Sequence, residues 1–439
     1  MNFLTEEAKA QLTKFGADNP TRLVARDEIA SILELEGQTN LAAFLSNYEQ
    51  PRFVAAGGSG LIFCCTYKPH GTLRALKIPR SRLLKGTDPT EEEDPEVEAL
   101  SKVSHQNIAR MYEDIRVAPG KHIVSSEWIP DAVELQEYVR ALCSKYGPDA
   151  KALQISGILQ QLAERLQEVI DAVDYLHIDA GMYHFDIKPP NLMVSASANR
   201  GIAKAYVIDL GLAQDIQKCK GMAEVSVGFT WRYAHTALTE IAAARISEDQ
   251  NKAKSKIPLS SLGPQYDLFA FGRTIQECLA ILESFYREKA RTNYYFRFIH
   301  LLACLCLDGK NEHTEQWRKS EVDFVEDFAE GCGKDILLGH RFTSASEVSS
   351  ILRRLLGRHS LEQDCSELDS WYPNTINASD IAFVNLTPRV KRIVVTPVFK
   401  RLEQERQLGM LQEVFPTATH SRGNHALGTQ STQVKPEPA

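Results

Sequence analysis

Apolar residues recur at intervals of three and four along residues 158–176. They are Ile158, Leu159, Leu162, Leu166, Val169, Val173 and Leu176. This spacing places them on one face, so it predicts a long amphipathic helix. Residues 1–50 are typical of two or three shorter helices, interrupted by Asp-Asn-Pro at 18–20 and Glu-Gly-Gln at 36–38.

Apolar and β-branched residues surround the sequence Gly-Gly-Ser-Gly at 57–60, and a second apolar run follows at 74–78. This pattern predicts two strands joined by a glycine-rich turn. Such a turn lets backbone N–H groups approach a phosphate closely, because no Cβ blocks the approach. Taken alone, the pattern also fits a plain hairpin with a flexible tip.

The composition is that of an ordinary soluble protein. The chain has 439 residues, 43% apolar and 24% charged, with a net charge of −7, which indicates neither a nucleic acid nor an anionic membrane as partner. The apolar run at 298–307 is too short to span a bilayer, and the first residues lack the features of a signal peptide. Nine cysteines without a C-x-x-C pair indicate a reducing compartment, so we expect a cytoplasmic protein.

Candidate chemistry is concentrated in the sequence Y-H-F-D-I-K-P-P-N-L-M-V at 183–194. It places Asp186, Lys188 and Asn191 on one loop before a short apolar strand. Phosphoryl transfer needs these three kinds of group. The carboxylate orients a hydroxyl and accepts its proton, the ammonium steadies the moving phosphate, and the amide oxygen holds a metal ion.

This loop resembles the H-R-D-x-K-x-x-N catalytic loop of eukaryotic-type (Hanks-type) Ser/Thr protein kinases. The resemblance implies an α+β, bilobal fold with a small β-rich N-lobe and a larger helical C-lobe. It implies ATP and Mg²⁺, with Mn²⁺ possible, and a protein substrate. We expect a helical extension at 1–50, the kinase domain at 51–357 and a linker at 358–378. The segment 379–439, after about Ala378, should be a C-terminal helical fragment of one or two loosely packed helices, or mobile chain.

The resemblance also assigns the binding residues. The phosphate-covering loop would comprise Gly57, Gly58, Ser59, Gly60 and Ile62. Lys77, in Ala-Leu-Lys-Ile, would contact the α- and β-phosphates. Asn191 and Asp209, the latter in Asp-Leu-Gly, would hold the metal. The adenine would lie against the hinge near Glu127 and Ile129, between Ala75 and Met193.

Lys77 needs a carboxylate partner, and Glu96 is the matching residue, with Glu98 as the weaker candidate. Pro95 directly precedes Glu96. Proline fits the first position of a helix and Asp94 fits the N-cap, so we expect a short helix with Glu96 in its first turn.

Two further sequences fit the same family. Tyr-Asp-Leu-Phe-Ala-Phe-Gly at 266–272 resembles the start of its central C-lobe helix, where Asp267 would brace the catalytic loop. Arg-Phe-Thr-Ser-Ala-Ser-Glu at 341–347 resembles the opening of its last helix.

The chain departs from the family in its regulatory positions. Phe185 replaces the arginine that receives an activation-loop phosphate, so we expect neither Ser226 nor Thr230 to be an obligatory switch. Each Ser226→Ala or Thr230→Ala variant should keep a sizeable share of activity. Ala237 stands where a glutamate is usual, unless Glu240 reaches Arg341. An insertion at about 246–262, rich in lysine and serine, follows.

The C-terminal part resembles a different family. Residues 396–428 contain Thr-Pro-Val-Phe-Lys-Arg-Leu and Val-Phe-Pro-Thr-Ala-Thr-His-Ser-Arg-Gly-Asn-His-Ala-Leu-Gly. These resemble the opening of HD-domain phosphohydrolases of the deoxynucleotide triphosphohydrolase type, in which His425 would be the first metal ligand. The other ligands have no counterpart in the given sequence, so we expect a truncated HD segment without a catalytic metal. An amphipathic helix with a disordered end is the simpler alternative.

Three functions therefore compete. The first is an active Ser/Thr kinase of the non-RD type, with Phe185 before the catalytic aspartate. The second is a nucleotide-binding pseudokinase, suggested by Ala55, Phe185 and Ala237. The third is a kinase domain that regulates an HD phosphohydrolase, in a longer chain or in a partner. Because Lys77, Asp186, Asn191 and Asp209 are all present, we favour the active kinase.

Overall fold

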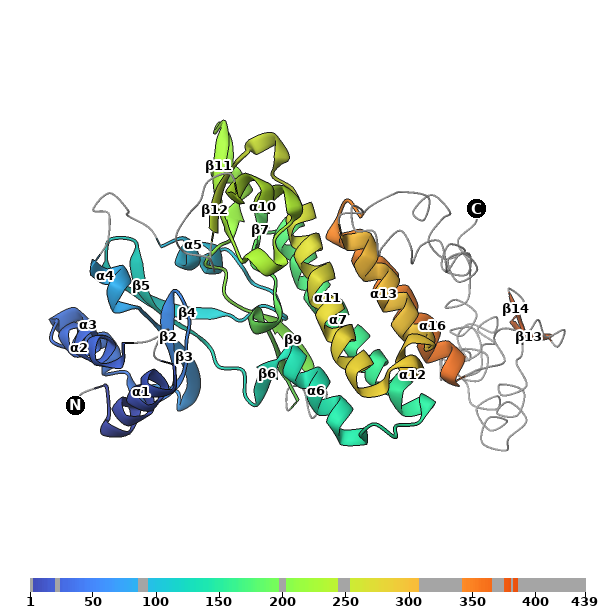
Figure 1. Ribbon diagram of the computed structural model, residues 1–439, viewed down its shortest axis with the longest axis horizontal. Helices are drawn as coiled ribbons and strands as arrows, with labels where there is room; N and C mark the ends of the chain where they lie inside the picture. The colour runs from blue at the N-terminus through green and yellow to red at the C-terminus, as the bar shows by residue number, and fades with distance from the viewer. Residues whose placement is uncertain are drawn as a thin grey trace, which may run out of the picture. The chain divides into compact units, whose positions relative to one another are not determined.

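The computed structural model describes residues 3–19, 24–85, 94–196, 203–243, 253–307, 342–364, 375–379 and 382–385. The chain divides into two compact units, Met1–Arg353 and Arg354–Ala439. The first unit contains a five-stranded sheet with the N-terminal helices on one side of it, followed by a mainly helical lobe (Figure 1). The expected bilobal α+β fold is confirmed.

Three helices precede the sheet where two or three were expected. They are α1 (Glu6–Asp18), α2 (Ala25–Glu36) and α3 (Thr39–Leu45). The Thr5 hydroxyl caps α1 by accepting a hydrogen bond from the Ala8 amide at 3.2 Å. The first two helices end at the predicted interruptions.

The N-lobe sheet is antiparallel, in the order β1-β2-β3-β5-β4. Its strands are β1 (Tyr48–Ala56), β2 (Gly60–Tyr67), β3 (Thr72–Pro79), β4 (Met111–Ala118) and β5 (Lys121–Glu127). Two short helices, α4 (Ser81–Lys85) and α5 (Pro95–Ser101), lie between β3 and β4 in sequence. As predicted, α5 begins at Pro95, and Asp94 caps it by accepting from the Glu96 amide at 3.0 Å.

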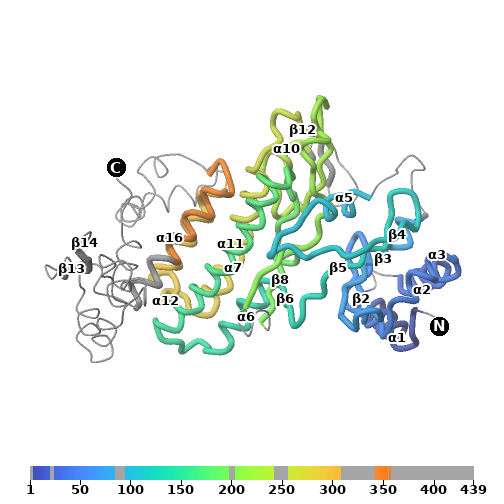
Figure 2. Tube along the Cα trace, turned by 180° about the vertical axis from the view of Figure 1, so that it is seen from behind, coloured from blue at the N-terminus to red at the C-terminus, as the bar shows by residue number. Residues whose placement is uncertain are grey.

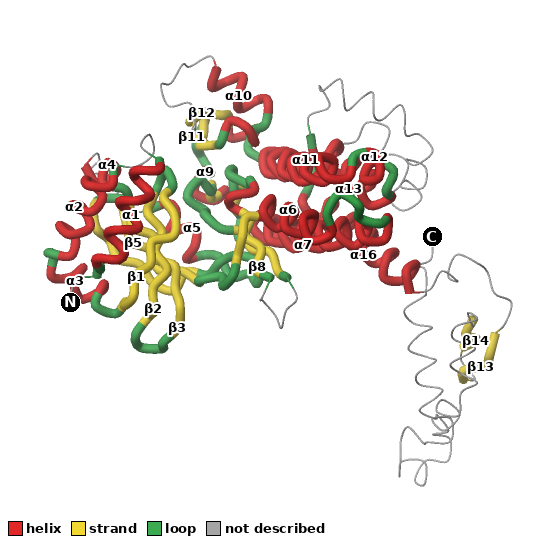
Figure 3. Tube along the Cα trace, turned by 60° about the horizontal axis from the view of Figure 1, so that its bottom comes forward, coloured by secondary structure: helices red, strands yellow, loops and turns green. Residues whose placement is uncertain are grey.

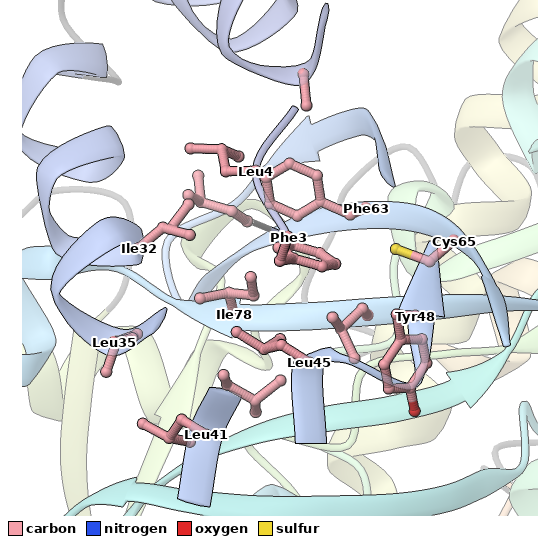
Figure 4. Packing of buried hydrophobic residues seen from close by; sticks show 14 of the residues in the cluster. Phe3, Leu4, Ile32, Leu35, Leu41, Leu45, Tyr48, Phe63, Cys65 and Ile78 are labelled. Carbon is pink, nitrogen blue, oxygen red and sulfur yellow. The ribbon is translucent and has the colours of Figure 1, made fainter. Parts of the chain in front are cut away.

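One face of this sheet forms a core with the N-terminal helices. Figure 4 shows Phe3, Leu4 and Ile32 gathered beside Phe63 and Ile78 of the sheet, all at most 5% exposed. Side chains alternate between the two faces of a strand, so residues 62, 75 and 77 point to the opposite face. The N-terminal helices therefore cover one face and leave the other for the second lobe.

The C-lobe is mainly helical (Figure 3). Its helices are α6 (Leu135–Tyr146), α7 (Ala152–Ile178), α11 (Gln265–Tyr286), α12 (Glu288–Arg291), α13 (Tyr294–Cys306) and α16 (Ala345–Asp364). Of these, α7, α11 and α13 each contribute many buried residues. The helix predicted at 158–176 is confirmed as part of α7, and all seven of its apolar residues are fully buried. Among the described helices, none combines the length and apolar character needed to cross a membrane.

A small sheet carries the catalytic loop. It comprises β6 (Ala132–Glu134), β8 (Leu192–Ser195) and β9 (Lys204–Val207), in the order β6-β8-β9. A backbone connection joins it to the N-lobe, because the Val207 amide donates to the Asn107 carbonyl at 2.8 Å and the Ala109 amide donates to the Val207 carbonyl at 3.1 Å. Figure 2 shows these strands beside the five-stranded sheet.

The segment after β9 pairs twice with other parts of the chain. Its elements are β10 (Gln214–Asp215), α9 (Ile216–Cys219), β11 (Glu224–Phe229), η2 (Trp231–Tyr233) and α10 (Thr236–Ala243). The strand β10 pairs with β7 (Met182–Tyr183). The strand β11 pairs with β12 (Ala253–Pro258), which is followed by η3 (Leu259–Ser261). Thus β12 lies in the predicted insertion.

The second unit departs from expectation where it is described. The helix α16 continues to Asp364, into the segment 358–378 predicted as linker. After Ala378 we expected helices or mobile chain, but β13 (Thr375–Ser379) and β14 (Ala382–Asn385) form an antiparallel hairpin. Ile376 stands opposite Val384 in the backbone register of this hairpin. Residues 386–439, with most of the HD-like segment, lie outside the described residues.

Candidate active site

The catalytic loop runs from β7 through η1 (Pro189–Asn191) to β8. Its central carboxylate, Asp186, is 2% exposed and has both oxygens engaged. Oδ2 accepts from Lys188 Nζ at 2.7 Å and from Asn191 Nδ2 at 3.0 Å. Oδ1 accepts from Thr230 Oγ1 at 2.6 Å. Asp186 therefore meets both predicted loop partners and a hydroxyl from a more distant segment.

Asp267 braces the backbone of the catalytic loop, as the sequence predicted. Its carboxylate accepts from the backbone amides of His184 and Phe185, both at 2.7 Å, and lies 2.8 Å from His177 Nε2. Burial alone would raise the pKa of Asp267, but the hydrogen bond and charge of His177 outweigh burial and lower it. The loop backbone is thus fixed by a charged acceptor. Phe185 itself has φ +62°, a strained conformation for a residue with a side chain.

Lys77 lies between two carboxylates. Its Nζ is 2.5 Å from Glu96 Oε2 and 3.1 Å from Asp209 Oδ1. The structure thus pairs Lys77 with Glu96 rather than Glu98. Burial would lower the pKa of Lys77, but Glu96 and Asp209 raise it well above its ordinary value. Lys77 therefore remains a cation at neutral pH, as a phosphate contact requires.

Glu98 instead ties α5 to the segment after β9. Lys102 Nζ lies 2.6 Å from Glu98 Oε1 and 2.5 Å from Asp215 Oδ2. Lys218 forms an ion pair with the other oxygen of Glu98. The helix that carries Glu96 is consequently fastened to β10 and α9 by partly exposed charges.

The glycine turn lies next to Lys77. The Gly57 amide donates to the Gly60 carbonyl at 2.9 Å and closes the turn that contains Gly58 and Ser59. A Cβ on Gly60 would lie 2.9 Å from both the Ile78 carbonyl oxygen and Lys77 Cγ, closer than a side chain can approach. Only glycine therefore fits at position 60, and the turn is kept close to the lysine.

The remaining predicted nucleotide residues share this face of the sheet. Ile62 stands opposite Lys77 in the β2–β3 register, and Ala75 is two residues before Lys77, so their side chains point the same way. Glu127 ends β5, and Ile129 is buried two residues later. From the other lobe, β8 contributes the half-buried Met193.

The donor set of the predicted metal site suits a magnesium ion. Asn191 uses its amide nitrogen on Asp186, which leaves the amide oxygen as the atom that could ligate a metal. The Ile208 amide donates to the Asn191 carbonyl at 2.9 Å, so Asn191 lies beside the strand end that carries Asp209. Amide and carboxylate oxygens are ligands that Mg²⁺ prefers. Asp209 has φ +61°, a second strained position in the site.

Phe185 packs in an apolar cluster, at the position where the family has an arginine that receives a phosphate. Its ring stacks on Tyr266 with centroids 5.2 Å apart. The cluster also contains the inward residues of β11, Val225, Val227 and Phe229, together with Ile257 of β12. Apolar packing thus joins the catalytic loop, the segment after β9 and the insertion.

Sequence reasoning missed the roles of two residues. We expected Thr230→Ala to keep a sizeable share of activity. The structure shows in addition that Thr230 bonds to Asp186 and, at 3.1 Å, to Lys188 Nζ, contacts that the sequence did not indicate. Glu277 of α11 accepts from the Tyr233 hydroxyl at 2.7 Å and pairs with Arg232. It anchors the end of the same segment from far along the chain. The suggested Glu240–Arg341 contact cannot be followed, because Arg341 lies outside the described residues.

Comparison with known proteins supports the resemblance to protein kinases. A family model described as a protein kinase domain matches residues 48–359. CBL-interacting protein kinase 1 of Oryza sativa subsp. japonica is 28% identical over 41% of this chain and 35% of its own length. Serine/threonine-protein kinase ATG1b of Arabidopsis thaliana is 30% identical over 42% of this chain and 23% of its own length.

A third relative, the probable serine/threonine-protein kinase fhkD of Dictyostelium discoideum, is 26% identical over 41% of this chain and 22% of its own length. The chain thus spans about a third or less of these relatives. The family match, by contrast, covers most of the chain and includes every residue assigned to the site above. The chain belongs to the protein kinase domain family.

Proposed function

We propose that this protein is an ATP- and Mg²⁺-dependent serine/threonine kinase that phosphorylates a protein hydroxyl. The observation that carries the proposal is the position of Asp186, bonded to Lys188, Asn191 and Thr230 in one buried arrangement. Lys188 is the residue that the resemblance associates with Ser/Thr rather than Tyr kinases. The names of the three relatives agree with this choice.

The chain's own groups divide the reaction between them. Asp186 orients the substrate hydroxyl and takes its proton as the oxygen bonds to the γ-phosphorus and the bond to ADP breaks. Lys188 offsets the charge of the moving phosphoryl group, and Lys77 positions the α- and β-phosphates. Asn191 and Asp209 would hold Mg²⁺, with Mn²⁺ as a possible substitute, which would neutralise phosphate charge when bound.

The proposal is tested with Asp186→Asn and Asp209→Asn, assayed by phosphate transfer from labelled ATP to a generic basic protein. We expect each variant to lose on the order of 10²-fold or more of the rate. Asp179→Asn, an exposed substitution at the end of α7, is the control. Unchanged transfer by Asp209→Asn would overturn the proposal. Nucleotide binding without transfer by the unaltered protein would favour the pseudokinase.

We further propose that the kinase is of the non-RD type and needs no phosphate on its activation segment. The burial of Phe185 with β11 and β12 supports this, because apolar packing and strand pairing hold the segment already.

We retain two proposals from the sequence. Residues 379–439 are proposed to be an HD-like segment without a catalytic metal, and an HD phosphohydrolase is a possible partner or continuation. The cytoplasm is proposed as location, supported by the seven cysteines of the described residues, which are buried and form no disulfide.

A further inference from the structure

The N-terminal helices share one apolar core with the N-lobe sheet, and this core contains a buried ion pair. Glu28 of α2 is 3% exposed, and Arg80, directly after β3, is 6% exposed. Glu28 Oε1 lies 2.5 Å from Arg80 Nε, and Oε2 accepts from the Ser81 amide at 2.9 Å. Both carboxylate oxygens are therefore used to hold the chain that follows β3.

The arginine continues from this pair to the glycine turn. Arg80 Nη1 donates to the Gly57 carbonyl at 3.1 Å, and its backbone amide donates to the Ser59 carbonyl at 3.4 Å. Arg82 Nη2 donates to the Gly58 carbonyl at 3.2 Å. Three successive carbonyl groups of the turn thus receive hydrogen bonds from the segment that Glu28 holds.

Fixing these carbonyl groups also sets the direction of the turn's amides. In a trans peptide the C=O and N–H groups point in opposite directions. The carbonyl of Gly57 belongs to the same peptide as the amide of Gly58, and the carbonyl of Gly58 to that of Ser59. Because Arg80 and Arg82 bind the carbonyl groups of Gly57 and Gly58, the amides of Gly58 and Ser59 point away from these arginines. Such aligned amides are what a phosphate binds.

We propose that the N-terminal helices set the nucleotide affinity of the kinase, because Glu28 holds Arg80 and Arg80 fixes the glycine turn for phosphate binding. This inference rests on the proposed function in that the turn binds ATP. Glu28 and Arg80 are positioning residues that need not touch the nucleotide. A partner that displaced α2 would lower ATP affinity without altering any residue of the catalytic loop.

The test uses the full chain with four variants. Glu28→Gln keeps the shape and removes the charge, and Arg80→Lys keeps the charge but loses the fork that reaches both Glu28 and Gly57. The double variant Glu28→Leu/Arg80→Met replaces the pair with apolar side chains of similar size, so α2 stays packed. Gln11→Leu is the control, because Gln11 bonds to the Phe53 amide at 2.9 Å and links α1 to the sheet without touching the turn.

Three quantities are measured: hydrogen exchange of amides 56–61, the dissociation constant of a fluorescent ATP analogue with Mg²⁺, and kcat and KM for ATP. In the three pair variants we expect turn amides to lose protection, and the dissociation constant and KM to rise about tenfold, as for one lost charge-assisted hydrogen bond. We expect kcat to stay within about twofold and Gln11→Leu to match the unaltered protein.

The outcomes separate this inference from the proposed function. If the unaltered protein binds nucleotide but transfers no phosphate, the kinase proposal fails, while exchange and affinity still decide the role of Glu28 and Arg80. Thermal unfolding and exchange in α2 show whether the double variant remains packed. A packed double variant with unaltered turn protection and affinity would overturn the inference, as would a Gln11→Leu variant with the same losses.

Discussion

Thr230 connects the catalytic carboxylate to the segment after β9. Its hydroxyl donates to Asp186 and accepts from Lys188, so one side chain orients both the proposed base and the proposed phosphate-binding cation. The contact spans 44 residues of sequence. It therefore forms only when that segment is in place, which makes the geometry of Asp186 dependent on the segment.

We expect Thr230→Ala to lower kcat/KM for a basic protein substrate about tenfold, because a charge-assisted hydrogen bond to Asp186 is lost. Thr230→Ser keeps the hydroxyl and should keep most of the activity. Steady-state kinetics of the two variants, with circular dichroism as a check of folding, distinguishes the cases. An alanine variant as active as the serine variant would show that the hydroxyl does not position Asp186.

The residues that sequence alone could place are those with neighbours at fixed spacing. Lys188 and Asn191 follow Asp186 by two and five positions, and the structure brings all three together. Glu28 and Glu277 were missed for a physical reason. Each meets its partner only after distant helices pack, 52 residues away for Arg80 and 44 for Tyr233, and nothing local distinguishes them from surface carboxylates.

At the scale of elements, the strand β12 shows how context creates secondary structure. Its sequence, Ala-Lys-Ser-Lys-Ile-Pro, contains one large apolar residue, and Ile257 is 1% exposed. The strand forms because β11 supplies a partner and the cluster around Phe185 receives Ile257. By contrast, α7 was predictable because the apolar residues of its buried face recur at helical spacing within one continuous stretch of sequence.

We expect Ile257→Ala to loosen β11 and lower activity, because truncating a buried isoleucine costs about 2–5 kcal/mol. Lys256→Ala, one residue earlier and exposed, is the matched control. Limited proteolysis measures the loosening of β11, and phosphate transfer measures the activity.

Ser226→Ala should keep the activity of the unaltered protein in the phosphate-transfer assay, since packing rather than a phosphate holds the strand β11. Loss of activity in Ser226→Ala would mean that a phosphate on Ser226 is required. Lys256 stands directly opposite Ser226 and could receive that phosphate.

The support of the catalytic loop by α11 predicts a pH-dependent stability. The pKa of Asp267 is lowered in the fold, so its contribution is present above the unfolded value of about 3.9 and is lost as pH falls through the folded value. Asp267→Asn should cost about 3 kcal/mol at pH 7. In denaturant unfolding, the difference from the unaltered protein should shrink below about pH 4. A difference independent of pH would contradict a charged Asp267.

For the whole molecule, the division into two units separates the site from the C-terminal segment. Every residue of the proposed active site lies in Met1–Arg353. The described residues contain no group of three or more His, Cys, Asp or Glu side chains arranged to hold a metal ion. The two sequence resemblances therefore concern parts of the chain that can be tested apart.

We expect a chain ending near Leu368 to keep essentially full kinase activity, because it retains the whole first unit. The segment after about Ala378 should bind no catalytic Mn²⁺, Fe²⁺ or Zn²⁺, and the full chain should release no triphosphate from deoxynucleotides, since His425 alone cannot supply a metal site. Elemental analysis of the protein and of His425→Ala measures this. Bound metal that disappears in the variant would instead indicate a half-site completed by another polypeptide.

The ties between α5 and the segment after β9 make the proposed kinase activity sensitive to ionic strength. Lys102 and Lys218 are 40% and 52% exposed, so dissolved ions reach their bonds to Asp215 and Glu98. The screening length shortens from about 8 Å at physiological salt to about 3 Å at 1 M. Concentrated salt therefore loosens the helix that carries Glu96 while the apolar cores, which salt does not weaken, persist. The kinase should become inactive in salt before it unfolds, and recover on dilution.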